Sequence, residues 1–258
     1  MSALGRPEYE LVLMIISNDP KEVIARISRL DSIGSYILKA KVKESIHDIY
    51  FDTPDRQLGR HRLNLRVRRT LEGRWITLKK SPGLFARNRN QRNETELEWS
   101  IESLARIIQE VGQNGVNVRT RGTDPGKSDQ EDPISSLKGL GLEIIQDRET
   151  NREPKSVLSS NGETAAELAI DSVTYHFERR DVLLDEVEIE AKSKEEQHVV
   201  DDLADTLTRL IGPELKKWRS GKLSTGNKID RLLKGGRLQS LMKDGRLTPE
   251  AYDLLLRA

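Results

Sequence analysis

The sequence predicts an α+β protein in which about eight antiparallel strands close into a barrel. The interior of the barrel forms a charged tunnel, and helices pack outside it. Five or six segments alternate ionic and aliphatic residues with a period of two, and others carry apolar residues at helical spacing. The ionic faces also sort by sign, with acids near residues 8, 94, 171 and 186 and bases near 66 and 79. A solvated face normally mixes acidic, basic and neutral polar residues, so we expect these charge-sorted faces to line the interior of the barrel.

Composition narrows the class of protein. The 258 residues are 35% hydrophobic and 33% charged, with a net charge of +1, so any electrostatic function must come from local segregation of charge. The absence of cysteine excludes disulfides, thiolate metal sites and a cysteine nucleophile. No apolar run approaches the roughly 20 residues that span a bilayer, so we expect a cytoplasmic protein without a membrane partner.

The first strand is expected in "PEYELVLMI", Pro7 to Ile15. A period of two places Glu8 and Glu10 on one face, and Tyr9, Leu11, Leu13 and Ile15 on the other. A helix should follow from about residue 20 to 31, since Asp19 or Asn18 can cap it and Pro20 suits its first turn.

The middle of the chain predicts four further strands, followed by a helix from Ile101 to about Val111. In "LNLRVRR", Leu63, Leu65 and Val67 oppose Asn64, Arg66 and Arg68; in "WITLKK", Ile76 and Leu78 oppose Thr77 and Lys79. In "RNETELEW", Arg92, Glu94, Glu96 and Glu98 share one face. A polar loop is expected from Gly112 to Asp132.

The last third predicts three more strands and a helix at about 194–211. In "DEVEIEAK", Glu186, Glu188, Glu190 and Lys192 oppose Val187, Ile189 and Ala191. The tail reads as two short helices joined at Asp244–Gly245, the second beginning at Thr248 and Pro249. We therefore expect a tunnel domain over 1–230 and a helical extension over 231–258, which could dock on the barrel or on a second subunit to form a homodimer.

Such a tunnel needs ligands, because unpaired charges removed from bulk water are unfavourable by several kcal/mol each. Neighbouring carboxylates can converge on a hard divalent cation. Rows of Arg and Lys suit phosphate. The two together predict a site for a polyphosphate–metal complex.

The motifs, in their order and spacing, resemble the CYTH superfamily of triphosphate tunnel metalloenzymes, over about residues 7 to 228. "EYE" (Glu8–Glu10) resembles the start of the ExExK signature, "IYFDTPDRQL" the Asp-Thr segment, "LRVRR" the Arg-x-Arg pair and "ITLKK" the lysine that follows. "RNETELE", "ELAID" and "EVEIE" are similar to the later acidic motifs, and "GKLSTG" to the Ser-Lys-Tyr segment.

The resemblance implies a role for each matching residue. The expected ligands of Mg²⁺ or Mn²⁺ are Glu8, Glu10, Asp171, Glu186 and Glu188. The expected triphosphate-binding residues are Arg66, Arg68, Lys79, Arg92, Arg148, Arg152 and Lys222. Catalysis is assigned to Glu8, Glu10, Lys79 and Glu188, while Glu94, Glu96, Glu98 and Glu190 could accept hydrogen bonds from the bases. For Arg148 and Arg152, a surface turn is the alternative.

One position departs from the family pattern, since Val12 stands where the signature has lysine. This removes a cation from the substrate side of the expected metal site. Lys41 and Lys43 alternate onto one face of the next strand and could replace it, but exposure to solvent is the favoured interpretation of both.

Three functions fit these expectations. The first is a metal-dependent hydrolase that removes the terminal phosphoryl group of inorganic triphosphate, thiamine triphosphate or a nucleoside triphosphate. The second is a class IV-type adenylyl cyclase, which needs a base-binding pocket although only 4% of residues are aromatic. The third is a catalytically weak polyphosphate- or nucleotide-binding module. In each the partner is a small triphosphate-containing molecule, with no specific nucleic acid.

Overall fold

The structure is a computed structural model that describes residues 9–80, 93–118, 132–193 and 195–258. The described residues form two compact units. Of the described residues, the inserted unit holds Ile46–Asp147, and the flanking unit combines residues 9–45 with the segment from Arg148 onward. The division falls inside two strands, β4 (Glu44–Asp52) and β8 (Glu143–Leu158).

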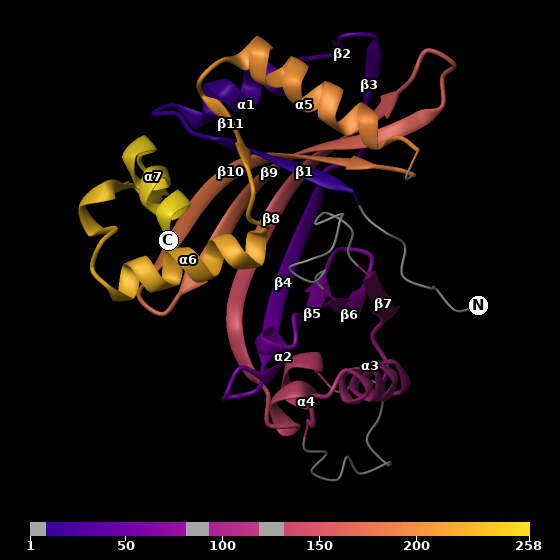
Figure 1. Cartoon of the computed structure of the whole chain (residues 1–258), viewed down its shortest axis with the longest axis vertical. Coiled ribbons are helices and arrows are strands. Elements are labelled where there is room, and N and C mark those ends of the chain that lie inside the picture. Colours follow the sequence, from indigo (N-terminus) through magenta and orange to yellow (C-terminus); the bar gives the residue numbers. More distant parts are fainter. Residues whose placement is uncertain (1–8, 81–92, 119–131, 194) are drawn as a thin grey trace. The chain divides into compact units, whose positions relative to one another are not determined.

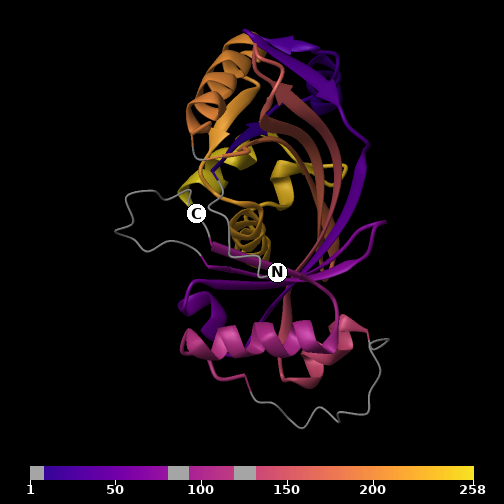
Figure 2. The same ribbon diagram turned by 90° about the vertical axis from the view of Figure 1, so that its right-hand side faces the viewer.

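The inserted unit contains an antiparallel sheet in the order β4, β5 (Leu63–Arg69), β6 (Arg74–Lys80), β7 (Asn93–Glu98). Its aliphatic face, which includes Leu65, Val67 and Ile76, packs against α3 (Ile101–Gln113) and α4 (Pro133–Gly139). Figure 2 shows α3 lying along this sheet. Leu104, Ile107 and Val111 form the buried stripe of α3, so the opposite, ionic face is left free of these helices.

The Asp-Thr segment of the sequence ends β4 and starts the short helix α2 (Gln57–Arg60). The buried Asp52 carboxylate accepts hydrogen bonds from the backbone N–H groups of Thr53, Leu58 and Gly59. The Thr53 hydroxyl accepts from the N–H of Gln57. Aspartate and threonine therefore serve here to satisfy the helix N-terminus.

The flanking unit is built on the strands β11 (Leu215–Trp218), β1 (Glu10–Ile15), β10 (Arg180–Ala191), β9 (Thr164–Phe177) and β8, in that order. β3 (Tyr36–Ala40) pairs with β8 and with the short β2 (Ser32–Ile33). One face of this sheet packs against α1 (Pro20–Ser28) and α5 (Gln197–Ile211) (Figure 1). The Asp19 side chain accepts a hydrogen bond from Glu22 N at the start of α1, as its sequence predicted.

The other face of the flanking sheet changes character along the strands. Glu10, Glu188 and Glu186 lie on it, and it then continues into an apolar cluster that includes Val12, Met14 and Ile16. This cluster packs under α6 (Lys222–Lys234) and α7 (Pro249–Arg257) (Figure 1). The C-terminal segment thus docks on its own chain, within the flanking unit.

The tail differs from its predicted pair of helices. α7 is confirmed, but the segment before it forms the 3₁₀ turn η1 (Gln239–Leu241) and a hairpin of β12 (Met242–Lys243) and β13 (Arg246–Leu247). The predicted break at Asp244–Gly245 is a two-residue hairpin turn, in which both residues have positive φ, 49° and 77°. The helix predicted before it is wrong, because Met242 and Lys243 pair with Leu247 and Arg246 as strands.

The α+β class and the largely antiparallel sheet are confirmed. The described residues form thirteen strands, more than expected, because strands of two to four residues such as β2, β11, β12 and β13 are too short to show a period of two. No helix in the described part of the chain has the length and apolar character needed to cross a membrane.

Candidate active site

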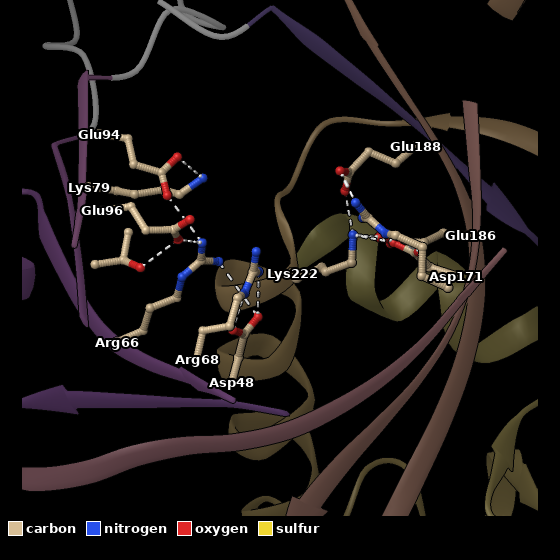
Figure 3. Close-up of polar contacts among 12 residues, drawn as sticks. Asp48, Arg66, Arg68, Lys79, Glu94, Glu96, Asp171, Glu186, Glu188 and Lys222 are labelled. Atoms are coloured by element: carbon tan, nitrogen blue, oxygen red, sulfur yellow. Dashed lines mark hydrogen bonds and ion pairs between the residues drawn. The ribbon is translucent and has the colours of Figure 1, made fainter. Parts of the chain in front are cut away.

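The ionic face of the inserted unit carries an arginine network of Arg66, Arg68 and Lys79 with Asp48, Glu94 and Glu96. The strand registers Asp48↔Arg68, Thr77↔Glu96 and Lys79↔Glu94 bring these side chains onto one face. Arg66 Nη2 donates to Glu94 Oε1 at 3.1 Å and to Glu96 Oε2 at 3.3 Å, and Lys79 Nζ lies 2.7 Å from Glu94 Oε2. Figure 3 shows these side chains together.

Arg66 is 5% exposed, so its charge depends on these partners. Burial disfavours the charged form, but Asp48, Tyr50, Glu94 and Glu96 hold the pKa of Arg66 well above its ordinary value. Three carboxylates face three cations in the network. A triphosphate that bound here would therefore compete with Glu94 and Glu96 for the guanidinium of Arg66.

Asp48 is a member of this network although it was not among the predicted site residues. Its buried carboxylate accepts two hydrogen bonds from Arg68, Nε to Oδ1 at 2.8 Å and Nη2 to Oδ2 at 3.0 Å. This bidentate pair fixes the orientation of the Arg68 guanidinium. The parity of "HDIYFD" could have revealed it, since Asp48 alternates with the aliphatic Ile49.

A separate carboxylate cluster lies in the flanking unit and consists of Asp171 on β9 with Glu186 and Glu188 on β10. The register Glu186↔Asp171 places two of them side by side, and Glu188 follows two residues along the same face. One carboxylate oxygen from each lies within 4.8 Å of the others. Asp171 and Glu186 are almost fully buried, so their charges need compensation.

Two cations supply this compensation, Arg152 and Lys222, the second of which is labelled in Figure 3. Lys222 Nζ lies 2.9 Å from Asp171 Oδ2 and 2.6 Å from Glu186 Oε1, and it also donates to Glu188 Oε2. Arg152 on β8 holds Asp171 with two hydrogen bonds, at 2.8 and 2.7 Å, and reaches Glu188 Oε1 at 3.0 Å. The cluster is thus an ion network of three carboxylates and two cations, with a formal charge of −1.

The two glutamates respond differently to this environment. Burial raises the pKa of Glu186, and Lys222 offsets only part of that shift. Burial also acts to raise the pKa of Glu188, but Lys222 and Arg152 outweigh it and hold the pKa well below its usual range. For Lys222, burial acts to lower the pKa, yet the carboxylates of Glu186, Glu188 and Asp171 keep it well above its ordinary value.

The structure places the predicted site residues in several groups. Arg66, Arg68 and Lys79 lie in the arginine network. Asp171, Glu186 and Glu188 form the carboxylate cluster, where Arg152 and Lys222 join them rather than the other predicted phosphate-binding residues. Arg148 is buried. Glu8 and Arg92 fall outside the described residues.

Glu10 lies one row away from the carboxylate cluster. It is the register partner of Glu190, which in turn faces Glu167 on β9, so this row holds three glutamates. Lys41 Nζ donates to Glu167 Oε2 at 2.6 Å, whereas Lys43 pairs with Glu153 and is much more exposed, 73% against 42% for the side chain of Lys41. Of the two lysines considered as substitutes for a lysine at position 12, Lys41 therefore contacts this acidic row.

The sequence profile of the CYTH domain matches residues 21–220. The chain belongs to the CYTH family. Its members are enzymes that bind triphosphate-containing substrates and depend on divalent metal, and the CYTH fold is a tunnel barrel, the architecture predicted from the charge-sorted strands. No curated protein matches the chain.

Solved structures similar to this CYTH chain include a protein from Pyrococcus horikoshii OT3, 22% identical, with a TM-score of 0.47 over 88% of this chain and 99% of the other. A Hippeastrum protein described as a putative adenylyl cyclase with a dominant triphosphatase activity is 18% identical, with a TM-score of 0.49 over 90% and 97%. A putative adenylate cyclase from Bacillus halodurans is 16% identical, with a TM-score of 0.44 over 84% and 96%.

The carboxylate cluster of this CYTH chain fits a divalent metal. Its donors are all carboxylate oxygens, which Mg²⁺ and Mn²⁺ prefer, and they are close enough together for one ion to contact all three. The cluster already attracts positive charge, since Lys222 contacts each of the three residues. Asp171, Glu186 and Glu188 are therefore suited to hold the ion.

Proposed function

We propose that this CYTH protein is a metal-dependent triphosphatase that cleaves the terminal phosphoryl group from a triphosphate-containing substrate. The observation that carries the proposal is the carboxylate cluster, in which Asp171, Glu186 and Glu188 converge at the same point as the cations of Arg152 and Lys222. Carboxylates for a metal and nitrogen donors for phosphate thus lie within one group of side chains.

Each group of residues has a distinct part in the proposed reaction. Asp171, Glu186 and Glu188 would hold Mg²⁺ or Mn²⁺, which when bound supplies charge neutralisation of phosphate oxygens and activation of water. Arg66, Arg68 and Lys79 would bind phosphate oxygens, with Asp48 orienting Arg68. Lys222 and Arg152 would stabilise negative charge close to the carboxylates.

Glu8, Glu10 and Arg92 keep their proposed roles from the sequence. Glu8 and Glu10 are further metal ligands and Arg92 a further phosphate contact. Lys79 has a proposed catalytic role because it is a cation on the same face as Arg66. Arg148 remains a proposed phosphate contact, in a buried setting.

Release of phosphate from tripolyphosphate, thiamine triphosphate and ATP, with Mg²⁺ or Mn²⁺, tests the proposal. We expect metal-dependent phosphate release from at least one of them, and none from the Asp171→Asn variant. Formation of a cyclic nucleotide from ATP would identify a cyclase instead. Binding of these triphosphates without turnover would identify a binding module, the function that Val12 at the signature position favours.

A further inference from the structure

The carboxylate cluster holds its own cation. Lys222 Nζ is the atom in the described structure that contacts all three carboxylates of the cluster, Asp171 Oδ2 at 2.9 Å, Glu186 Oε1 at 2.6 Å, and Glu188 Oε2. A divalent ion coordinated by the same residues would need oxygens that the ammonium group now contacts. Two cations competing for one set of oxygens repel each other strongly where solvent is excluded.

We propose that Lys222 acts as an internal counter-ion that a divalent metal must displace from the carboxylate cluster. This inference rests on the proposed function, because that function assigns the metal to these carboxylates. It adds a specific role for Lys222, which would exchange between the carboxylates and a phosphate group.

The backbone of Lys222 is held by contacts that do not involve its side chain. The buried Tyr175 hydroxyl donates to the Lys222 carbonyl oxygen at 2.9 Å. Further along α6, Ile229 and Leu232 are buried in the apolar cluster under α7. The lysine side chain, a flexible four-carbon stem with one compact charge, can therefore swing away without moving the helix.

Arg152 is the less exchangeable of the two cations. Its planar guanidinium donates one hydrogen bond to each carboxylate oxygen of Asp171, at 2.8 and 2.7 Å, in a fork geometry. A metal ion contacting one oxygen of Asp171 leaves the second oxygen for Arg152. The carboxylates thus keep one cation, while the ammonium of Lys222 becomes available for an anion.

This exchange couples the two ligands of the proposed reaction. In the free protein, Lys222 opposes metal binding. A phosphate group that receives the displaced ammonium removes this opposition, so the phosphate promotes metal binding and, reciprocally, metal promotes phosphate binding. A protein without Lys222 should lose the opposition and bind metal more tightly on its own.

The test is the affinity of the full chain for Mn²⁺ alone, measured by isothermal titration for wild type and Lys222→Met. We expect Lys222→Met to bind Mn²⁺ at least tenfold more tightly, and Lys222→Arg, which keeps the charge, to gain much less. Lys217→Met is the matched control, because it removes a lysine of the same sheet whose partner, Asp205, lies outside the carboxylate cluster. It should change Mn²⁺ affinity by less than threefold. Unchanged or weaker Mn²⁺ binding by Lys222→Met would overturn the proposal.

A second measurement does not depend on the variant folding. A crystal structure of the wild-type protein with Mn²⁺ at the cluster should show Lys222 Nζ withdrawn from all three carboxylates. Lys222 still in contact with them beside the bound ion would refute the exchange. If the wild-type protein hydrolyses triphosphate but Lys222→Met does not bind Mn²⁺ more tightly, this inference is refuted and the proposed function stands. If Lys222→Met binds Mn²⁺ more tightly but the wild-type protein hydrolyses no triphosphate, the proposed function is refuted and this inference stands.

Discussion

Val12 and Glu188 are register partners on β1 and β10, so their side chains lie on the same face of the flanking sheet. Val12 is nevertheless buried in the apolar cluster that includes Trp218 and the inner residues of α6 and α7. The departure from the family signature therefore has a physical reason, because position 12 borders both the carboxylate cluster and the apolar packing of the C-terminal segment.

Replacing Val12 with lysine should add a cation beside Glu188. We expect weaker Mn²⁺ binding, because a third positive charge would join Arg152 and Lys222 at the carboxylates. We also expect a loss of about 1–3 kcal/mol in the free energy of unfolding, because the longer side chain overpacks the apolar cluster. Isothermal titration and chemical denaturation measure the two effects, with Val12→Met as the apolar control. Higher turnover at unchanged metal affinity would mean that the lysine contacts phosphate instead.

Glu188→Gln and Glu10→Gln test the assignment of metal ligands. Each should abolish metal-dependent turnover, since each removes a charged oxygen donor. Glu188→Gln should also lower the Tm of the metal-free protein, because it weakens the contacts with Arg152 and Lys222. Glu163→Gln, in an exposed turn, serves as the control and should keep wild-type turnover. Wild-type activity of either site variant across a metal titration would remove that residue from the metal site.

Arg66→Ala and Leu65→Ala separate the two faces of β5. Arg66→Ala should weaken triphosphate binding by about 1.5–3 kcal/mol, the range for hydrogen bonds to charged groups. It should also destabilise the fold by about 3–5 kcal/mol, because Asp48, Glu94 and Glu96 lose a buried partner. Leu65→Ala should destabilise by about 2–5 kcal/mol and leave affinity unchanged, since Leu65 packs in the core under α3. Titration calorimetry with a triphosphate measures the affinity of each variant. If Arg66→Ala loses stability but keeps wild-type affinity, Arg66 is not a phosphate ligand.

Glu167 should make stability depend on acid pH. Burial acts to raise its pKa, but the hydrogen bond from Lys41 and the charges of Lys192, Lys41 and Arg152 lower it below the ordinary 4.5. A lowered pKa in the folded state stabilises the protein above the unfolded pKa, and this contribution disappears as pH falls through the folded pKa. Lys41→Met should raise the Glu167 pKa and flatten the loss of stability below about pH 4.5. NMR titration of the Glu167 carboxyl checks the direction; an unchanged pKa would show that Lys41 does not set it.

The side of the sheet on which each strand residue lies could be predicted from the sequence. Leu65 and Ile76 pack against helices, while Arg66 and Lys79 lie on the opposite, ionic face, because a period of two fixes the face regardless of what the strand packs against. The convergence of Asp171, Glu186 and Glu188 also agrees with the predicted acidic strands.

The partners within each ion network could not be predicted in this way. They depend on the register between strands, which set Asp48 opposite Arg68, and on where a distant helix begins. Lys222 starts α6 and points to the carboxylates, whereas its motif suggested a place among the phosphate-binding residues. The hairpin at Asp244–Gly245 was missed because the apolar spacing of Leu238, Leu241 and Met242 imitates a helix.

The change from ionic to apolar residues along one face of the flanking sheet also means that the local dielectric constant falls along that face. Glu186 lies next to the apolar cluster under α6 and α7 and is 2% exposed, whereas Glu190 and Glu10 lie farther along the strands, towards solvent. The same unit charge therefore produces a stronger field near Glu186 than near Glu10. A divalent ion that binds at the carboxylate cluster must exchange part of its water shell for carboxylate oxygens. Mn²⁺ loses water more easily than the strongly hydrated Mg²⁺, so we expect Mn²⁺ to enter the cluster faster than Mg²⁺ even where their final affinities are alike.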